Sequence, residues 1–561
     1  LKIQPNRHNW EEIMKQFCSH QGEQNPFPRG KLSSGMAFVG GSLAFLIIML
    51  GILIYSPPKD TTETTVRTDQ NSDSQETELA DDEAGSEGGD DESLLMYCAA
   101  GIKPPVAALA AQFAEEVFGV PVHLQYGGSG TLLSNLQVAK KGDLYLAADT
   151  SYIEIAREKN LVKEAIPVAQ MHPVIMVKKG NPKKIQSIDD LTKEGVSFSL
   201  ANPDAASIGK LTKKELEKVK KWDAVSKSAR VFKPTVSEVA NDVLLGAVDA
   251  GIVWDATVNQ HSDKAEMIEV PEFAQAVKNV TVGILNSSRK PQQALMFARY
   301  LQAPEKGQKL FSSMGYQPVK GDTWDPHPQI LLFSGGVNRL AIQDTLKAFE
   351  QREGISISVV YNGCGILVGQ INSGQRPDAY FACDTSYMVQ VQPMFTLPLT
   401  VAETDMIIIV EKGNPKNIKS VYDLTGENIK VGIAHHEQSA LGALTKKLLG
   451  PLVAGDKSLY DAIQPNVKTN TPTADLLVNQ LRTGSLDAAI VYRANISKVA
   501  DKLDVVEIKE GRPLAEQPIA ILKSTKYPNL MQRLVDQLTS ESSRVIFESR
   551  GFRWRITPES L

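Results

Sequence analysis

A glycine-rich string is the feature of this sequence best suited to hold a ligand. Residues 127–131 read Gly-Gly-Ser-Gly-Thr between a predicted strand, Val120–Tyr126, and a predicted helix, Thr131–Lys140. A helix that begins at such a string presents unpaired N–H groups and the positive end of its dipole, and glycine lets a ligand come close to the backbone. With the Ser129 hydroxyl added, the string indicates an anion site. The more common use of such a string is a tight turn with a serine cap.

Other chemical interpretations of the chain fail on residue type. No Lys follows the string, so it is not a P-loop, and Thr131 stands where a nucleophile elbow needs Gly. We interpret Asp149 and Asp384 as helix caps rather than a carboxylate pair, and His435-His436 as a loop rather than a metal site. No nucleophile, base and orienting group occur together, so we expect a protein that is not an enzyme and carries no cofactor.

The elements that would position these loops occur twice. Asp-Thr-Ser-Tyr at 149–152 recurs at 384–387, and Gly-Asn-Pro-Lys at 180–183 recurs at 413–416. Gly-Ile-Val-Trp at 251–254 corresponds to Ala-Ile-Val-Tyr at 489–492. The offset stays between 233 and 238 residues. A repeat of that length is a whole domain, so the sequence predicts a tandem duplication.

Each repeat alternates short apolar runs with helical patterns. In the first, Leu94–Ala99 and Asp143–Ala148 are predicted strands and Val106–Phe118 a predicted helix; the second has the same order from Ile330–Ser334 to Tyr380–Asp384. This alternation is typical of parallel α/β layers. Later apolar strands bracket a middle section in each repeat: Pro173–Val177 and Val280–Leu285, then Asp405–Val410 and Pro518–Leu522. The bracketing predicts two lobes joined by a double hinge.

A charge-free apolar run precedes the repeats. The twenty residues Met36–Tyr55 could cross a bilayer as a helix of about 30 Å. Lys and Arg residues before the run place the N-terminus in the cytoplasm by the positive-inside rule. We therefore expect six segments: a short cytoplasmic segment (1–35), a transmembrane helix (36–55), a disordered acidic tether (56–92), a first module (93–319), a linker (320–329) and a second module (330–561).

Charge and cysteine content exclude two classes of protein. The net charge is −5, of which residues 56–92 alone carry −11, so the remainder is only mildly basic and no nucleic-acid partner is expected. Four cysteines in 561 residues are too few for a disulfide framework. Cys364 and Cys383 are close enough in sequence to pair, but the sequence does not fix their geometry.

Taken together, the motifs resemble the periplasmic molybdate/tungstate-binding proteins of ABC transporters. The resemblance rests on the Gly-Gly-Ser-Gly-Thr loop, Asp-Leu-Tyr-Leu-Ala-Ala-Asp (143–149), Asn-Pro-Asp-Ala-Ala-Ser-Ile-Gly (202–209) and Gly-Ile-Val-Trp. It covers nearly all of 94–318 and, more weakly, 330–555. It implies two tandem type II periplasmic-binding modules, each with two α/β lobes that close on an oxyanion.

The resemblance also implies ligand-binding positions, several of them altered here. The family's first-loop serine is replaced by Gly101 and Gly336, and its second-loop serine is kept as Ser129 but replaced by Cys364. The family's tyrosine hydroxyl becomes Trp254 in the first repeat and remains as Tyr492 in the second. The positions of its second-lobe backbone donors are Ile208, Val236, Leu441 and Ala474. We expect the first repeat to be the working site.

Three functional hypotheses follow. The first is a membrane-anchored extracytoplasmic receptor, in a cell (inner) membrane, that passes a molybdate-like oxyanion to an ABC permease. The second is a sensor or storage protein on the same scaffold with a different ligand. The third is an interaction protein whose pockets no longer bind.

Overall fold

A computed structural model describes residues 93–117, 119–511 and 513–557. The predicted membrane span Met36–Tyr55, the acidic tether and Cys18 all lie outside these residues. Within the described part of the chain, no helix is both long enough and apolar enough to span a bilayer.

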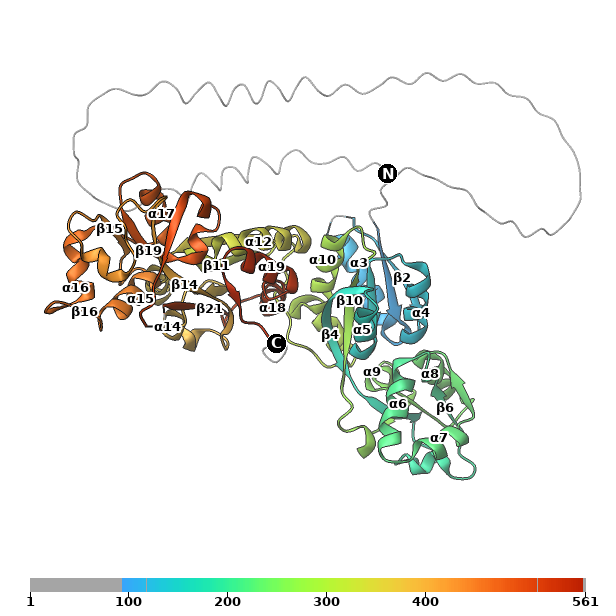
Figure 1. The fold of residues 1–561 in the computed structure, drawn as a ribbon. Helices are drawn as coiled ribbons and strands as arrows, with labels where there is room; N and C mark the ends of the chain where they lie inside the picture. The colour runs from blue at the N-terminus through green and yellow to red at the C-terminus, as the bar shows by residue number, and fades with distance from the viewer. Residues whose placement is uncertain (1–92, 118, 512, 558–561) are drawn as a thin grey trace, which may run out of the picture. The chain divides into compact units, whose positions relative to one another are not determined.

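The first lobe of the first module is a five-stranded sheet in the order β2-β1-β3-β10-β4. Strands β1, β2 and β3 are parallel, and β10 is antiparallel to β3 and β4. Figure 1 shows helices α3, α4 and α5 beside this sheet. The bounds are β1 Leu94–Ala99, α3 Lys103–Glu116, β2 Val122–Gly127, α4 Ser129–Ala139, β3 Leu144–Ala147, α5 Thr150–Glu158, β4 Val162–Met171, β10 Lys278–Leu285, α10 Pro291–Gln302 and α11 Lys309–Ser313.

The second lobe is a separate five-stranded sheet in the order β7-β6-β8-β5-β9. The chain enters it between β4 and β5 and leaves it between β9 and β10, so the predicted double connection is present. The predicted strand Pro173–Val177 lies in this lobe. The bounds are β5 Pro173–Lys178, β6 Phe198–Ala201, α6 Ser207–Lys218, α7 Trp222–Ser228, β7 Val231–Lys233, α8 Val236–Leu245, β8 Ala250–Trp254, α9 Asp255–Asn259 and β9 Ala265–Ile268.

The second module repeats this plan, but one strand is continuous through both of its lobes. Strand β14, Leu399–Glu411, pairs with β21 through residues 399–405 and with β19 through residues 406–410. The two sheets therefore become one ten-stranded sheet, whereas His172 interrupts the same path between β4 and β5.

The other elements of this module follow the order of the first. The first-lobe elements are β11 Gln329–Gly335, α12 Arg339–Glu353, β12 Ser356–Asn362, α13 Cys364–Asn372, β13 Ala379–Phe381, α14 Thr385–Val389, β21 Leu514–Ile521, α18 Pro528–Leu538, α19 Glu541–Ser549 and β22 Arg553–Trp554. The second-lobe elements are β15 Val431–Ala434, α15 Ala440–Leu449, β16 Val453–Ala454, β17 Lys457–Ser458, α16 Leu459–Ile463, β18 Val467–Thr471, α17 Ala474–Arg482, β19 Ala488–Tyr492 and β20 Leu503–Glu507.

Local sequence explains where helices begin. The side chain of Asp149 accepts a hydrogen bond from the backbone N–H of Ser151 at 2.8 Å, and Asp384 accepts one from Ser386 at 2.9 Å. Both aspartates are thus N-caps, as predicted, and satisfy a donor that has no partner inside the helix. The strands before them, Leu144–Ala147 and Ala379–Phe381, are buried throughout, which explains their unbroken apolar runs.

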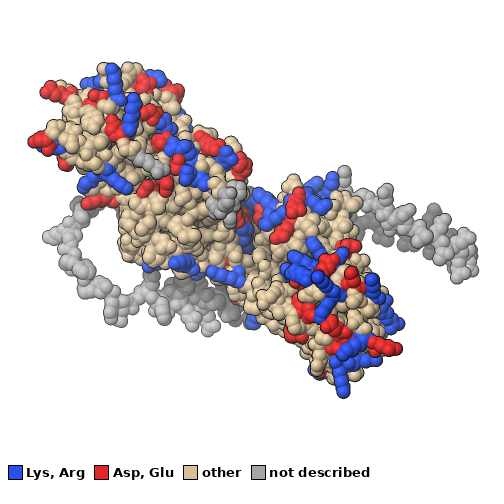
Figure 2. Space-filling model, turned by 60° about the horizontal axis from the view of Figure 1, so that its bottom comes forward, with Lys and Arg blue, Asp and Glu red and all other residues tan. Residues whose placement is uncertain are grey.

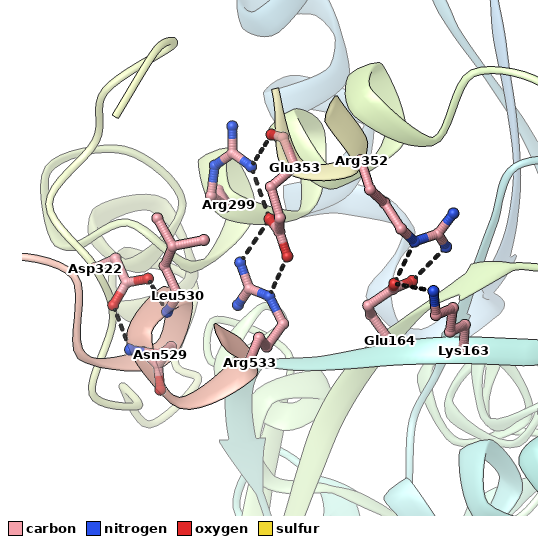
Figure 3. A network of polar contacts seen from close by, with 9 residues as sticks. All are labelled: Lys163, Glu164, Arg299, Asp322, Arg352, Glu353, Asn529, Leu530 and Arg533. Atoms are coloured by element: carbon pink, nitrogen blue, oxygen red, sulfur yellow. Dashed lines mark hydrogen bonds and ion pairs between the residues drawn. The ribbon is translucent and has the colours of Figure 1, made fainter. Parts of the chain in front are cut away.

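The two modules meet through a buried ion cluster around Glu353, at the end of α12 (Figure 3). Arg299 of the first module lies 3.1 Å from the Glu353 carboxylate and also donates to its backbone carbonyl at 2.9 Å. Arg533 of α18 donates to both carboxylate oxygens at 2.7 and 2.9 Å. Burial opposes ionisation of Glu353, but Arg533 and Arg299 hold its pKa below the usual value. The two guanidinium groups compensate the charge of Glu353, which a buried carboxylate requires.

The predicted linker is ordered at this junction. Asp322 accepts hydrogen bonds from the backbone N–H groups of Asn529 and Leu530 at the start of α18, at 2.8 and 2.9 Å. The indole of Trp324 packs edge-on against Tyr300 of the first module, 5.0 Å between ring centroids. The breaker-rich composition indicated a boundary between domains. The structure shows that this segment contacts both the first and the second module.

Candidate functional site

All five positions predicted for the first module line one cavity between its lobes. The cavity measures about 20 Å³, slightly more than a single water requires. Its lining is Ala99, Ala100, Gly101, Gly127, Gly128, Ser129, Ala148, Ala206, Ser207, Ile208, Thr235, Val236 and Trp254. A space of this size holds about one water, so a ligand of several atoms requires the two lobes to part.

Ser129 is the first residue of α4 and is 2% exposed. Its Oγ accepts a hydrogen bond from the backbone N–H of Ala148 at 3.2 Å. Because that bond uses an acceptor site, the hydroxyl proton stays free to donate to a ligand. The Ser129 carbonyl accepts the hydroxyl of Tyr145 at 2.7 Å, which anchors the loop to β3.

The glycines of this loop allow the two lobes to touch. The backbone N–H of Gly130 donates to the carbonyl oxygen of Ala205, in the second lobe, at 2.9 Å. A Cβ at Gly128 would overlap the same carbonyl oxygen and would also crowd that of Pro234. The structure therefore shows a closed cleft. It also shows that one of the backbone donors expected for the ligand is occupied across the cleft.

Helix N-termini supply the electrostatics of the cavity. Helices α4, α6 and α8 begin at Ser129, Ser207 and Val236, and Ile208 is the second residue of α6. Each start has N–H groups without a partner inside its own helix and a partial positive charge at the cavity wall, although in α4 the N–H groups of Gly130 and Thr131 donate to Ala205 across the cleft. The lining side chains carry no formal charge. A site of this kind suits an anion that offers only acceptor atoms.

Trp254 and Gly101 form one wall of the cavity. Trp254 is the last residue of β8 and is 1% exposed. A Cβ at Gly101 would lie 2.6 Å from Cγ1 of Val236 and 3.7 Å from Cδ1 of Trp254. The absence of a side chain at Gly101 therefore lets α8 approach the first lobe, and the first loop offers no hydroxyl at this position.

Ser207 lines the cavity and was not predicted. It is 2% exposed, and its hydroxyl has no hydrogen-bond partner among the described residues. Leaving such a group unpaired costs about 1–3 kcal/mol, so a ligand that pairs with it would gain affinity. The available signal was its place directly before Ile208 at the start of a predicted ligand loop.

The second module brings its predicted residues to the corresponding positions. Cys364 is the first residue of α13, Leu441 the second of α15, Ala474 the first of α17 and Tyr492 the last of β19. Gly365 donates its N–H to the carbonyl oxygen of Gln438 at 3.0 Å, so this cleft is closed as well.

Gly336 differs by one residue from its expected equivalence with Gly101. The short helix after the first strand begins at Ala100 in one module and at Gly336 in the other. Gly336 is thus level with Ala100, and Val337 with Gly101. The register of the two repeats shifts by one residue between this loop and the next, which the motifs alone could not place.

Sulfur replaces oxygen in the second cleft. Cys364 and Cys383 are 0% and 5% exposed, and their Sγ atoms lie 2.6 Å apart. Tyr492 adds a buried hydroxyl that has no hydrogen-bond partner among the described residues. Burial first, and then the neighbouring ionisable groups Cys383, Asp384 and Cys364, hold the pKa of Tyr492 well above its usual value. This cleft thus keeps a phenol donor but has no serine hydroxyl at position 364.

The histidine pair lies in a loop of the second module. His435 and His436 follow β15 in the loop before α15, as predicted, and their rings stack 5.3 Å apart. Among residues 93–117, 119–511 and 513–557, no three His, Cys, Asp or Glu side chains gather closely enough to hold an ion.

The connections between the lobes carry different charges in the two modules. In the first, His172 Nδ1 lies 2.8 Å from Asp255 and its Nε2 lies 2.9 Å from Glu269. The hydrogen bond to Asp255 is the main reason that the pKa of His172 is raised to about 9. At the matching place in the second module, Arg493 lies 3.6 Å from Asp405 and 2.6 Å from Glu507.

On the face that Figure 2 shows, basic and acidic side chains are interleaved over both modules. A continuous basic track, which a phosphate backbone would need, does not occur on that face.

Comparison with known proteins identifies two copies of one family along the chain. The family model for the bacterial extracellular solute-binding protein matches residues 94–317 and again 330–553. A putative binding protein of Haemophilus influenzae is 29% identical over 227 residues, which are 40% of this chain and 91% of that protein.

Two further relatives have named ligands. The molybdate-binding protein ModA of Mycobacterium tuberculosis is 25% identical over 225 residues, 40% of this chain and 84% of its own length. A sulfate-binding protein of Salmonella typhimurium is 27% identical over 248 residues, 38% of this chain and 75% of its own length. Each of these alignments has about the length of one module.

Proposed function

Because the chain belongs to the bacterial extracellular solute-binding protein family, we propose that it is a receptor for a small tetrahedral oxyanion of the molybdate or tungstate type. The receptor would be membrane-anchored and extracytoplasmic, and would deliver its ligand to an ABC permease. It binds this ligand and does not transform it.

The observation that carries the proposal is the uncharged cavity of the first module, on which three helix N-termini converge. A fully deprotonated oxyanion has only acceptor oxygens, so neutral N–H and O–H donors suffice to bind it. A monohydrogen phosphate must also donate its proton, and no carboxylate lines the cavity to accept it. The ligand positions Gly101, Ser129, Ile208, Val236 and Trp254 are thus proposed to discriminate by protonation as well as by size.

Titration calorimetry on the full chain tests this proposal. Molybdate and tungstate should bind at one strong site per chain, and phosphate at pH 7 should bind at least about a hundredfold more weakly, a difference near 2.7 kcal/mol. Sulfate serves as the size control, since it is tetrahedral and fully deprotonated but smaller. If none of the three deprotonated anions binds, the proposed function is wrong.

Anchoring by Met36–Tyr55 is tested in intact cells. The modules should remain with the membrane fraction at high salt, and protease added to spheroplasts should cut the acidic tether and release them. Modules that stay protected until the cells are lysed would place them on the cytoplasmic side and contradict a receptor role.

A sensor role is the second candidate, and the second cleft favours it. Receptors that only deliver a ligand need one binding site, but this chain has a second closed cleft with different donors, Cys364 and Tyr492. The second cleft would therefore bind a ligand with a different affinity from the first cleft. Equilibrium dialysis with both molybdate and sulfate would separate the candidates, since a retuned second site should prefer a different anion from the first.

A further inference from the structure

The two cysteines of the second cleft stand where the first cleft has a hydroxyl and a methyl group. Cys364 corresponds to Ser129, and Cys383, which directly precedes the helix cap Asp384, corresponds to Ala148. The backbone bond is also preserved: the N–H of Cys383 donates to Cys364 Sγ at 3.0 Å, as that of Ala148 donates to Ser129 Oγ at 3.2 Å. The two modules therefore differ at both of these positions but keep the same backbone hydrogen bond between them.

A third position accommodates the second sulfur. Gly335 ends β11 at the place where Ala99 ends β1. A Cβ at Gly335 would overlap Cys383 Sγ and would lie 3.2 Å from Cys364 Sγ. The first module, with Ala148 in place of the cysteine, has room for the methyl group of Ala99. Gly335 and Cys383 thus change together, which indicates that space for two adjacent sulfurs is a built feature of this cleft.

The separation and the surroundings of the sulfurs favour one chemistry. Their 2.6 Å separation is about 0.5 Å longer than the bond of a disulfide. Both cysteines belong to the first lobe, so a bond between them would not tie the lobes together. In the described part of the chain, no third His, Cys, Asp or Glu ligand joins them, which disfavours a metal centre.

One of the two thiols is suited to react first. Cys364 is the first residue of α13, where the helix dipole stabilises a thiolate. Burial opposes its ionisation, but hydrogen bonds from the thiol and the backbone N–H of Cys383 lower the pKa of Cys364. The hydrogen bond between the two thiols, followed by burial, holds the pKa of Cys383 well above its usual value. The asymmetry makes Cys364 the attacking group and Cys383 the one that closes the bond.

We propose that Cys364 and Cys383 form a reversible disulfide that sets the donor capacity of the second cleft. When the cleft opens, the Cys364 thiolate, which is buried in this closed structure, attacks one sulfur of a small external disulfide such as oxidised glutathione and expels one thiolate. Cys383 loses its proton and attacks Cys364 Sγ, which expels the second thiolate. Two cysteine thiols are oxidised, one external disulfide is reduced to two thiols, and the two protons pass to the departing thiolates.

The consequence for binding rests on the function proposed above. In the reduced state the Cys364 thiol, while it keeps its proton, can donate weakly toward an anion, and in the oxidised state neither sulfur has a proton to donate. Oxidation therefore leaves Tyr492 and the helix N-termini as the donors of this cleft. An extracytoplasmic location, where disulfides form and persist, would favour the oxidised state at rest.

Thiol counting on the full chain tests the disulfide without any ligand. The chain is equilibrated with reduced or oxidised glutathione, quenched with acid, denatured and alkylated. The reduced protein should take up four alkyl groups, and the oxidised protein should take up two fewer, with peptide mapping joining residue 364 to residue 383. The Cys98→Ala variant is the matched control and should still lose two, whereas Cys364→Ser and Cys383→Ala should lose none. Four reactive thiols in every buffer, or a bond that involves another cysteine, would overturn the proposal.

A second measurement separates this proposal from the proposed function. Molybdate binding is titrated on the Gly128→Val background, in which the first cleft cannot close, with the second cleft reduced and then oxidised. Any binding that remains at the second cleft should weaken several-fold on oxidation and recover with dithiothreitol. If the disulfide forms but molybdate binds neither cleft in any state, the proposed function fails while the redox pair stands. If binding at the second cleft is the same in both states, the donor role of the thiols is wrong.

Discussion

The two modules share one backbone design and differ in the side chains that fill it. In each, three helices begin at the cleft and a glycine loop of the first lobe donates a backbone N–H to a carbonyl of the second. The first cleft holds Ser129, Ser207 and Trp254, and the second holds Cys364, Ala440 and Tyr492 at the same places. The comparison indicates that backbone donors define the class of ligand, while a few side chains set whether each site binds.

The largest expected effect comes from blocking closure. In Gly128→Val, the added side chain would collide with the carbonyl oxygens of Ala205 and Pro234, which belong to the opposite lobe. We expect a loss of molybdate affinity of about a hundredfold or more, measured by calorimetry on the full chain. Gly363→Val makes the same collision in the second cleft with Gln438 and Pro472 and should leave the strong site intact. A greater loss from Gly363→Val would reverse the roles of the two modules.

Removal of the serine hydroxyl should have a smaller effect. Ser129→Ala deletes a donor to a buried anion, which costs about 1.5 kcal/mol or roughly tenfold in affinity. Cys364→Ser replaces a weak thiol donor with a strong hydroxyl donor in the equivalent place, so affinity there should stay unchanged or improve. Equilibrium dialysis of each variant with molybdate measures both changes. Indifference to Ser129→Ala would mean that backbone N–H groups alone hold the ligand.

The connections between the lobes should respond differently to pH. The protonated ring of His172 lies between Asp255 and Glu269, and its pKa of about 9 is above the ordinary value of 6.5. Its stabilisation is complete below pH 6.5 and is lost as the pH rises toward 9, by about 1 kcal/mol or somewhat more. Thermal unfolding between pH 6 and 9 should show this loss in the wild type. The difference from His172→Gln should shrink over the same interval.

The smallest expected change concerns the hydroxyl that the sequence did not single out. Ser207→Ala should weaken molybdate binding about threefold, since the N–H of Ile208 beside it can still hold the same oxygen. Ala440→Ser places a hydroxyl at the corresponding point of the second cleft and should strengthen binding there. Calorimetric titration of both variants gives the comparison. If Ser207→Ala weakens binding as much as Ser129→Ala, the two serines contribute equally.

Much of this design could be predicted from the sequence because local patterns determine it. The repeat motifs gave the two modules, apolar runs gave the strands, and the loops at their ends brought Ser129, Ile208 and Val236 to one cavity. The aspartate caps followed from the same logic, since a carboxylate directly before a helix has donors within reach.

The features that escaped prediction depend on contacts between distant residues. The one-residue shift that puts Gly336 level with Ala100 becomes visible only when strands are paired. The closeness of Cys364 and Cys383 depends on the missing side chain at Gly335. The partners of Glu353 come from α10 and α18, 54 residues away on one side and 180 on the other. No local pattern in a single sequence encodes such pairings.

The ion cluster at Glu353 has a further consequence for how two binding events combine. The contacts that Arg299 and Arg533 make with Glu353, and those that Asp322 makes with the start of α18, belong to first lobes or to the segment between the modules. Either second lobe can move relative to its first lobe without breaking these contacts. Ligand binding at one cleft should therefore not change the affinity of the other. The coupling free energy between the sites should then be close to zero, and a two-site titration should follow two independent hyperbolas. The chain would then carry two independent binding sites whose first lobes are joined to each other.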